Sequence, residues 1–105
     1  MPDESSFHQF ADLDRVVHEP ARLAIMAVLY SVESADFLYL LHSTGLTKGN
    51  LSSHLMRLEG AGYVQISKSF RGKLPQTNCA LTAAGRAAFQ NYRVSLRQAV
   101  DSLPT

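Results

Sequence analysis

The sequence predicts a small α+β domain that is mainly helical and carries one two-stranded hairpin. Leu51, Leu55 and Leu58 recur at i, i+4 and i+7, a spacing that places side chains on one face of a helix. Residues 63–67 alternate between apolar and polar side chains, apart from the first step, as a half-buried strand does. Apolar residues at spacings of three and four between Phe89 and Leu103 predict a final helix that packs against another helix.

Length and composition favour one folded domain over residues 1–105. The chain has 105 residues, of which 46% are hydrophobic, as is typical of a folded protein with a single modest core. No apolar run approaches the roughly 20 residues that a membrane span needs, and the acidic N-terminus lacks a signal-peptide pattern. A single cysteine excludes an internal disulfide. We therefore expect a cytoplasmic protein.

The first part of the chain is expected to begin with a helix over residues 6–18. Its apolar stripe has little to bury against in a lone small domain, which suggests a partner subunit. Pro20 suits the first position of the next helix, which runs to about Val32 and is apolar on two sides. A short helix over residues 35–43 follows. This short helix and the helix after it form the helix-turn-helix pair. The whole helix-turn-helix core is expected over residues 20–62.

The second helix of that pair follows a turn at Gly45 and has an unusual outward face. Thr47 is a good N-cap, because its hydroxyl can accept a hydrogen bond from a free amide in the first turn. Opposite the leucine stripe lie small polar and basic residues, including Asn50, Ser53 and Arg57. Small side chains let a partner approach closely, and Asn and Arg can each bond two atoms of a base edge. An ordinary surface helix of odd composition is the alternative.

The hairpin over residues 63–81 carries positive charge at its tip. Lys68, Arg71 and Lys73 have no acidic residue between them. Gly72 is expected to make the turn, and Pro75 keeps that edge from further pairing. The charges could serve solubility alone. Beside the preceding helix, contact with phosphates or with a minor groove is the better interpretation.

The last helix is expected over residues 82–103, with Thr82 as its cap. Its apolar seam favours a homodimer in which the terminal helices of two copies interlock. A helix that folds back on its own domain is the alternative.

Charge is distributed unevenly along the chain. Residues 1–42 hold two arginines against seven acidic residues, whereas residues 43–76 hold five basic residues against one glutamate. Positive charge therefore coincides with the helix and hairpin described above, and the acidic part is expected to face away from a polyanion.

An ordered series of motifs carries a resemblance to a known family. The chain reads EPARLAIM, then GLTKGNLSSHLMRLEGAGYV, then the basic hairpin, then LTAAGR. This series resembles small stand-alone winged helix-turn-helix transcriptional regulators related to the ArsR and MarR groups, over roughly Leu13 to Phe89. The resemblance implies a two-stranded wing with its tip at Phe70 to Leu74 and a recognition helix from Thr47 to Arg57. The apolar faces described above add N- and C-terminal dimerisation helices to this expectation.

Under this interpretation the protein is a sequence-specific regulator that binds double-stranded DNA as a homodimer. The expected DNA contacts are Thr47, Lys48, Gly49, Asn50, Ser52, Ser53, Arg57, Lys68, Arg71 and Lys73. The expected dimerisation residues are Phe7, Phe10, Leu13, Val17, Phe89, Tyr92, Leu96, Ala99 and Leu103. A winged-helix module that docks protein and never meets DNA is the alternative. Such a module should show apolar residues on this face, where Met56, Phe70 and Leu74 are the candidates.

Catalytic and metal sites are not expected, and neither is a cofactor. The sequence has no Gly-rich phosphate loop, no GxSxG motif and no histidine pair at ligand spacing. Metal sensors of the ArsR type carry paired cysteines in the helix before the recognition helix, but here that helix reads ADFLYLLHS. His54 is expected to bond backbone across the helix pair, and Cys79 to be a small buried hydrophobe rather than a redox switch. The sequence does not identify an effector ligand.

Overall fold

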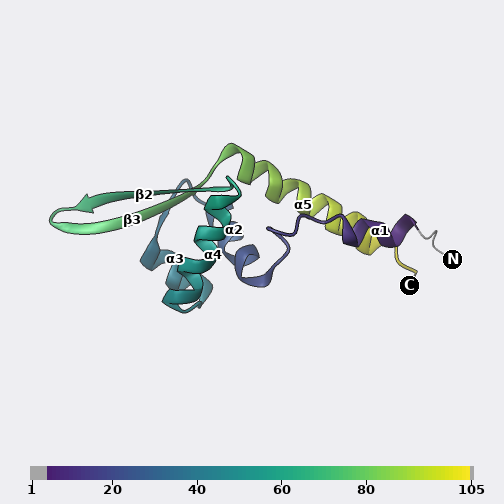
Figure 1. Ribbon diagram of the computed structural model, residues 1–105, viewed down its shortest axis with the longest axis horizontal. Helices are drawn as coiled ribbons and strands as arrows, with labels where there is room; N and C mark the ends of the chain where they lie inside the picture. The colour runs from purple at the N-terminus through teal and green to yellow at the C-terminus, as the bar shows by residue number, and fades with distance from the viewer. Residues whose placement is uncertain (1–4, 105) are drawn as a thin grey trace.

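The computed structural model describes residues 5–104, so the extreme ends of the expected domain lie outside the described residues. The described chain forms an elongated molecule with five helices and three strands, measuring 62 × 25 × 21 Å (Figure 1). The elements, in chain order, are α1 Ser5–Ala11, α2 Pro20–Tyr30, β1 Ala35–Asp36, α3 Phe37–Thr44, α4 Lys48–Gly60, β2 Val64–Arg71, β3 Leu74–Leu81 and α5 Ala83–Asp101. The expected fold class, α+β and mainly helical with a winged helix-turn-helix, is confirmed.

Side chains fix the starts of the helices. The Thr47 hydroxyl accepts a hydrogen bond from the Asn50 amide at 3.2 Å, and the Thr82 hydroxyl accepts one from the Gly85 amide at 2.9 Å, so both expected caps are confirmed. Asp36 caps α3 by accepting from the Tyr39 amide at 2.8 Å. Each bond satisfies an amide that has no partner inside its own helix.

The core lies where α2, α3 and α4 meet the sheet. The leucine stripe of α4 is buried, and it packs with Ile25 and Leu29 of α2 and Leu40 of α3. Burial of the stripe turns the opposite face of α4 outward. The same packing holds α4 in a fixed orientation on the domain.

The sheet has three strands in the order β1-β3-β2, all antiparallel. The expected helix over residues 35–43 instead starts at Phe37, because Ala35 and Asp36 pair with Cys79 and Asn78 of β3. The hairpin spans almost the expected residues, but its paired strands are longer and more regular than expected. Its ladder continues to the pair Arg71 and Leu74, so the tip is a two-residue turn in which Gly72 has φ +63°.

The expected N-terminal helix over residues 6–18 is shorter than expected and ends at Ala11. The Asp14 carboxylate accepts from the Val16 and Val17 amides at 2.9 and 3.2 Å, a local turn that competes with the helix. This turn folds Leu13 and Val17 back into the chain's own interior, where both are buried. The expectation that Leu13 and Val17 contact a partner subunit is therefore wrong.

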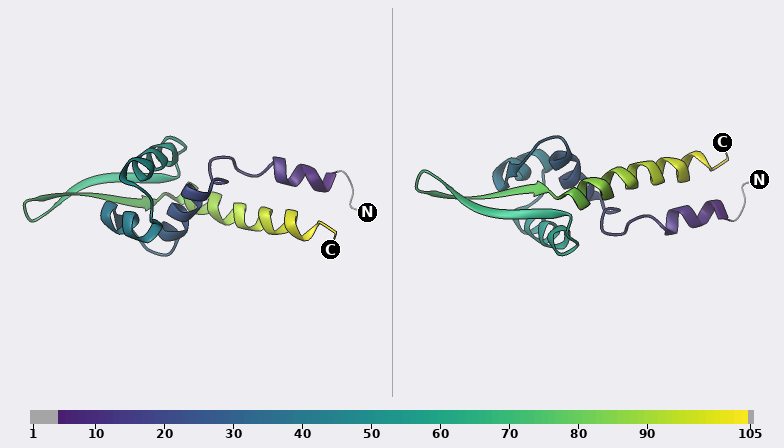
Figure 2. Two further views of the ribbon diagram at one scale, coloured as in Figure 1. Left: turned by 90° about the horizontal axis from the view of Figure 1, so that it is seen from below. Right: turned by 90° about the horizontal axis from the view of Figure 1, so that it is seen from above.

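Much of the α5 seam is also covered within the single chain. Figures 1 and 2 show α5 running away from the domain with α1 beside it. The Phe89 ring lies 5.4 Å from that of Tyr30, and the Tyr92 hydroxyl lies 2.6 Å from His18 Nδ1. Phe89, Tyr92 and Ala99 are buried, so their assignment to a subunit interface is corrected. For these three residues, the alternative of a helix packed on its own domain is correct.

The other expected dimerisation residues remain accessible. Phe10 and Leu96 are half-buried, whereas Phe7 and Leu103 are exposed. Val94 and Val100 of α5 are also exposed, and the seam pattern did not include them. The accessible apolar surface of α1 and α5 is therefore a different set from the one expected.

Candidate nucleic-acid interface

The outward face of α4 presents every expected contact residue to solvent. Burial of the leucine stripe leaves the opposite side of the helix free, and no large side chain shields the first turn. The exposed residues are Thr47, Lys48, Gly49, Asn50, Ser52, Ser53 and Arg57. This face combines a bare backbone at Gly49 with groups that can donate to base edges and phosphates.

The basic residues of this surface have no carboxylate partner among residues 5–104. The ion pairs found there join Glu19 to Arg22 at 3.8 Å and Glu19 to His54 at 3.5 Å. The five exposed cations of α4 and the wing are free of such pairs: Lys48, Arg57, Lys68, Arg71 and Lys73. Their charge is therefore available to an external anion.

His54 has a different role from the expected backbone bond. Its Nδ1 lies 3.2 Å from Arg22 Nη1 and 3.5 Å from the Glu19 carboxylate, so it ties α4 to the start of α2 through side chains. Burial disfavours the charged form of Glu19. Hydrogen bonds from the Arg22 and Ala21 amides and the nearby positive charges outweigh burial and lower its pKa. The cluster fixes α4 against the start of α2.

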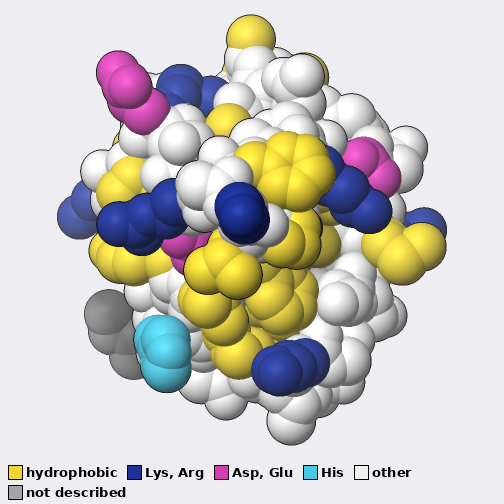
Figure 3. Space-filling view, turned by 90° about the vertical axis from the view of Figure 1, so that its left-hand side faces the viewer, with side chains coloured by type: hydrophobic (Ala, Val, Ile, Leu, Met, Phe, Trp, Pro, Cys, Tyr) yellow, Lys and Arg dark blue, Asp and Glu magenta, His cyan; other side chains and the backbone are white. Residues whose placement is uncertain are grey.

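The wing projects from the domain at the end opposite the termini (Figure 1). Viewed from that end, Lys and Arg side chains surround a central apolar patch (Figure 3). The most exposed large apolar residues on this side of the chain are Phe70 at 74%, Leu74 at 71% and Met56 at 69%. Leu38 of α3 is also exposed, and the sequence pattern did not single it out. The interface is thus both basic and apolar.

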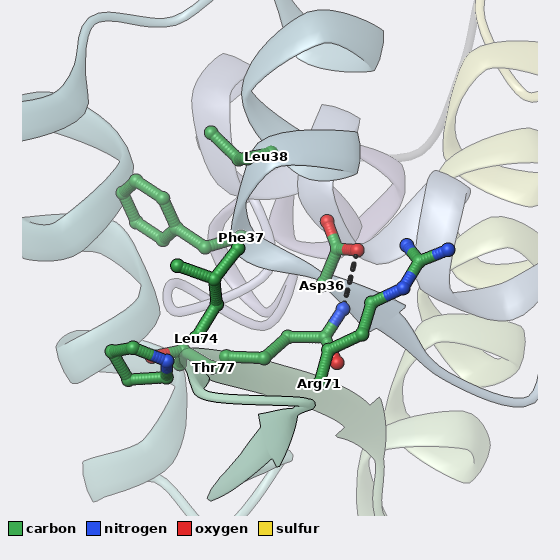
Figure 4. Close-up of a pocket in the computed structure, with 8 residues that line it drawn as sticks. Asp36, Phe37, Leu38, Arg71, Leu74 and Thr77 are labelled. Carbon is green, nitrogen blue, oxygen red and sulfur yellow. Dashed lines mark hydrogen bonds between the residues drawn. The ribbon is translucent and has the colours of Figure 1, made fainter.

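A groove of about 380 Å³ separates the wing from α3. Figure 4 shows Leu74 pointing toward Phe37 across this groove, with Arg71 and Asp36 at its other side. Gln76 Nε2 donates to Asp36 Oδ2 at 2.9 Å, and the same carboxylate caps α3. The outer half of the wing is therefore fastened to the start of α3, the helix that precedes α4.

Cys79 lies on β3 beneath the wing and is buried, as expected. Burial is the main cause that raises the pKa of its thiol to about 11, and Glu59 and Asp36 add to the rise. A thiol in this state has little thiolate at neutral pH and is a poor nucleophile.

We expect Cys79 to react with a maleimide or disulfide reagent far more slowly in the native protein than in 6 M guanidinium, because reaction requires the sheet to open. The rate ratio follows from mass spectrometry of timed samples. Comparable rates in the two conditions would contradict the burial of the thiol and revive a redox role.

Two absences hold for the described part of the chain. No cluster of three or more His, Cys, Asp or Glu side chains that could hold a metal occurs within residues 5–104. None of the described helices is both long enough and apolar enough to span a membrane.

Comparison with known proteins places this geometry in a family. Residues 21–100 match the family described as the winged helix DNA-binding domain. The chain belongs to the winged helix DNA-binding domain family. An uncharacterised protein from Methanocaldococcus jannaschii is 37% identical over 84 residues, which cover 80% of this chain and 91% of that protein.

Solved structures agree with the winged-helix assignment. The structure of a transcriptional regulator homologue from Pyrococcus horikoshii OT3 has a TM-score of 0.86 at 28% identity, and the match covers 93% of this chain and 99% of that one. A MarR-family transcriptional regulator from Silicibacter pomeroyi shares the fold, with a TM-score of 0.66 at 19% identity over 91% of this chain and 64% of that one. The resemblance to winged-helix transcriptional regulators is confirmed.

Proposed function

We propose that this winged-helix regulator binds duplex DNA sequence-specifically as a homodimer, with α4 in the major groove and the wing on the adjacent backbone or minor groove. The observation that carries the proposal is the exposed surface shared by α4 and the wing. Five cations on that surface lack a carboxylate partner among the described residues, and a small polar helix face lies between them. Such a surface suits a polyanion whose grooves display hydrogen-bonding edges.

The residues of this surface divide into two roles. Asn50, Ser53 and Arg57 lie on the outward face of α4, where they would read or approach base edges. The remaining cations would neutralise phosphates, which fixes position without reading sequence. The phosphate-contacting set is Lys48, Lys68, Arg71 and Lys73.

A homodimer accounts for the apolar surface at the other end of the molecule. Phe7, Val94, Val100 and Leu103 are exposed on α1, α5 and the turn that follows α5. Burial of such side chains against a second copy would remove apolar area from water. A two-fold dimer would then present two recognition helices to successive major grooves, about 34 Å apart.

The exposed apolar residues around the wing favour a second candidate, a module that docks protein instead of DNA. Leu38, Met56, Phe70 and Leu74 would supply its contact surface. Gel shifts with random duplex at several salt concentrations separate the two. DNA binding with about eight phosphate contacts per dimer gives a slope of log K against log salt near about −7, whereas a protein-docking module gives no shift.

Selection of bound duplexes from a random pool supplies the site for a sharper test. We expect Arg57→Ala to relax base preference at one position of each half-site, at a cost of roughly 1–3 kcal/mol on the matched site. Lys73→Ala should weaken matched and scrambled duplexes alike and reduce the salt slope by about 1 per subunit. The measurement is a binding titration of both variants on both duplexes.

The two variants serve as controls for each other, because both remove one exposed positive charge. Equal losses on matched and scrambled duplexes for both variants would contradict the division of roles between α4 and the wing.

A further inference from the structure

Phe70 is the most exposed large apolar side chain of the described residues, with 74% of its surface in contact with solvent. It lies on β2 two residues before the turn glycine, Gly72, at the far tip of the wing. The strand register places Phe70 opposite Pro75, and Arg71 opposite Leu74. Leu74 lines the groove against α3, whereas Phe70 does not. The ring of Phe70 therefore points into space that the described chain leaves empty.

The sequence neighbours of Phe70 on the wing are exclusively basic or neutral. Lys68, Arg71 and Lys73 lie within three residues of it, and no Asp or Glu occurs between Glu59 and Asp101. An apolar ring inside a cationic rim suits a partner that is anionic outside and less polar within. The minor groove of duplex DNA has this chemistry, with phosphates along both edges and stacked bases at its floor. The strand that carries Phe70, β2, also contacts α4, whose outward face is proposed above to meet DNA.

Strand pairing and side-chain hydrogen bonds hold the wing rigid along its length. Eight register pairs connect β2 to β3 from Val64 to the tip. Asn78 Nδ2 donates to the Ser69 hydroxyl at 2.8 Å across the ladder, and Gln76 Nε2, in the outer half of the hairpin, donates to Asp36 Oδ2 at 2.9 Å. Phe70 is thus carried by a rigid hairpin that is fixed to the domain, not by a flexible loop.

We propose that Phe70 enters the minor groove beside each half-site and wedges between two base pairs, so that the bound duplex is bent. This inference rests on the proposed function, since it requires the same surface to meet DNA. Apolar wedges of this kind unstack a base step and kink the duplex by roughly 20–90°. The wing would then select flexible pyrimidine–purine steps at its position without bonding their bases.

The wedge differs from the neighbouring cations in its salt dependence. Loss of an apolar contact lowers affinity by the same factor at every salt concentration, because no counterion is released with it. Loss of Lys73 reduces the salt slope, as described above. The two kinds of wing contact are therefore separable in one titration series.

The experiment uses the full chain and a selected duplex carrying donor and acceptor dyes at its ends, with 2-aminopurine at the step beneath the wing. Wild type should shorten the end-to-end distance and raise 2-aminopurine fluorescence. Phe70→Ala should abolish both signals and lower affinity on the order of tenfold, with an unchanged salt slope. Phe70→Leu, which keeps an apolar wedge, should retain most of the bend.

Tyr39→Ala is the matched control, because Tyr39 is also an exposed aromatic residue but lies on α3. It should leave both signals and the affinity unchanged. Circular dichroism checks that each variant is folded. Salt-sensitive binding of wild type to a straight duplex, or an unchanged bend with Phe70→Ala, would overturn the wedge and leave the proposed function standing. Absence of any salt-sensitive duplex binding by wild type would overturn both.

Discussion

Gly85→Ala is expected to lower the free energy of unfolding by about 3 kcal/mol, the upper part of the range for overpacked cores. A Cβ added at Gly85 would lie 2.0 Å from the Tyr63 carbonyl oxygen and 2.8 Å from its carbon. Both obstacles are backbone atoms, so no side-chain rotation can relieve the overlap. The first turn of α5 would have to move away from the start of the wing.

The surrounding hydrogen bonds resist that movement. The Thr82 amide donates to the same Tyr63 oxygen at 3.0 Å, and the Thr82 hydroxyl donates to the Gly62 oxygen at 2.6 Å. The Thr82 hydroxyl also caps α5 at the Gly85 amide. A shift of α5 therefore weakens a set of bonds that joins the wing to the terminal helix.

Urea denaturation followed by circular dichroism measures the loss, and Gly49→Ala is the matched control. A Cβ at Gly49 meets nothing within 4 Å, and the residue lies inside α4. The same substitution there should stabilise the fold by roughly 0.5–1 kcal/mol, because glycine is a poor helix residue. If Gly85→Ala proves as stable as wild type, the close approach of α5 to Tyr63 is contradicted.

Local chemistry explains why most of the fold could be predicted from the sequence. The caps at Thr47 and Thr82 depend on residues three positions apart. The burial of Leu51, Leu55 and Leu58 follows from helical periodicity. The same periodicity puts the expected α4 contact residues on the face opposite the buried leucines. All of them are therefore found on the surface.

One miss has a non-local cause, and the other combines a local turn with a non-local bond. Ala35 and Asp36 form a strand only because β3, more than 40 residues later, offers partners for them. The N-terminal helix ends early because the Asp14 carboxylate bonds nearby amides, and its other oxygen accepts from the Tyr63 hydroxyl at 2.6 Å. The Asp14 bond also raises the pKa of Tyr63. Neither pairing leaves a signal in the local sequence.

The error in the terminal helices has a different origin. A seam of apolar residues shows that α5 packs against something, but it does not say whose residues cover it. Tyr30, His18 and α1 of the same chain cover Phe89, Tyr92 and Ala99. The residues left for a partner include Leu103 of the seam and, outside it, Val94 and Val100, which only their exposure in the folded chain identifies.

Val100→Asp/Leu103→Asp is expected to separate the proposed dimer. Both side chains are exposed, so the change should leave the single chain folded. In a two-fold interface each copy would bring two carboxylates into an apolar contact. These carboxylates would have no basic partner there, and they would lie close to the equivalent carboxylates of the second copy. Sedimentation velocity at micromolar concentration should then give a monomer where wild type gives a dimer.

The effect on DNA binding should be larger than that of any single contact. A dimer engages the second half-site at an effective concentration in the millimolar range, so its loss should weaken binding to a two-half-site duplex by about 100-fold or more. Affinity for a single half-site should change little, since α4 and the wing are untouched.

Gln90→Asp/Gln98→Asp adds the same charge to exposed positions of α5 and should leave both affinities near wild type. If the Val100/Leu103 variant remains a dimer, the interface lies elsewhere. If it becomes a monomer with undiminished affinity for the two-half-site duplex, the two recognition helices do not act together.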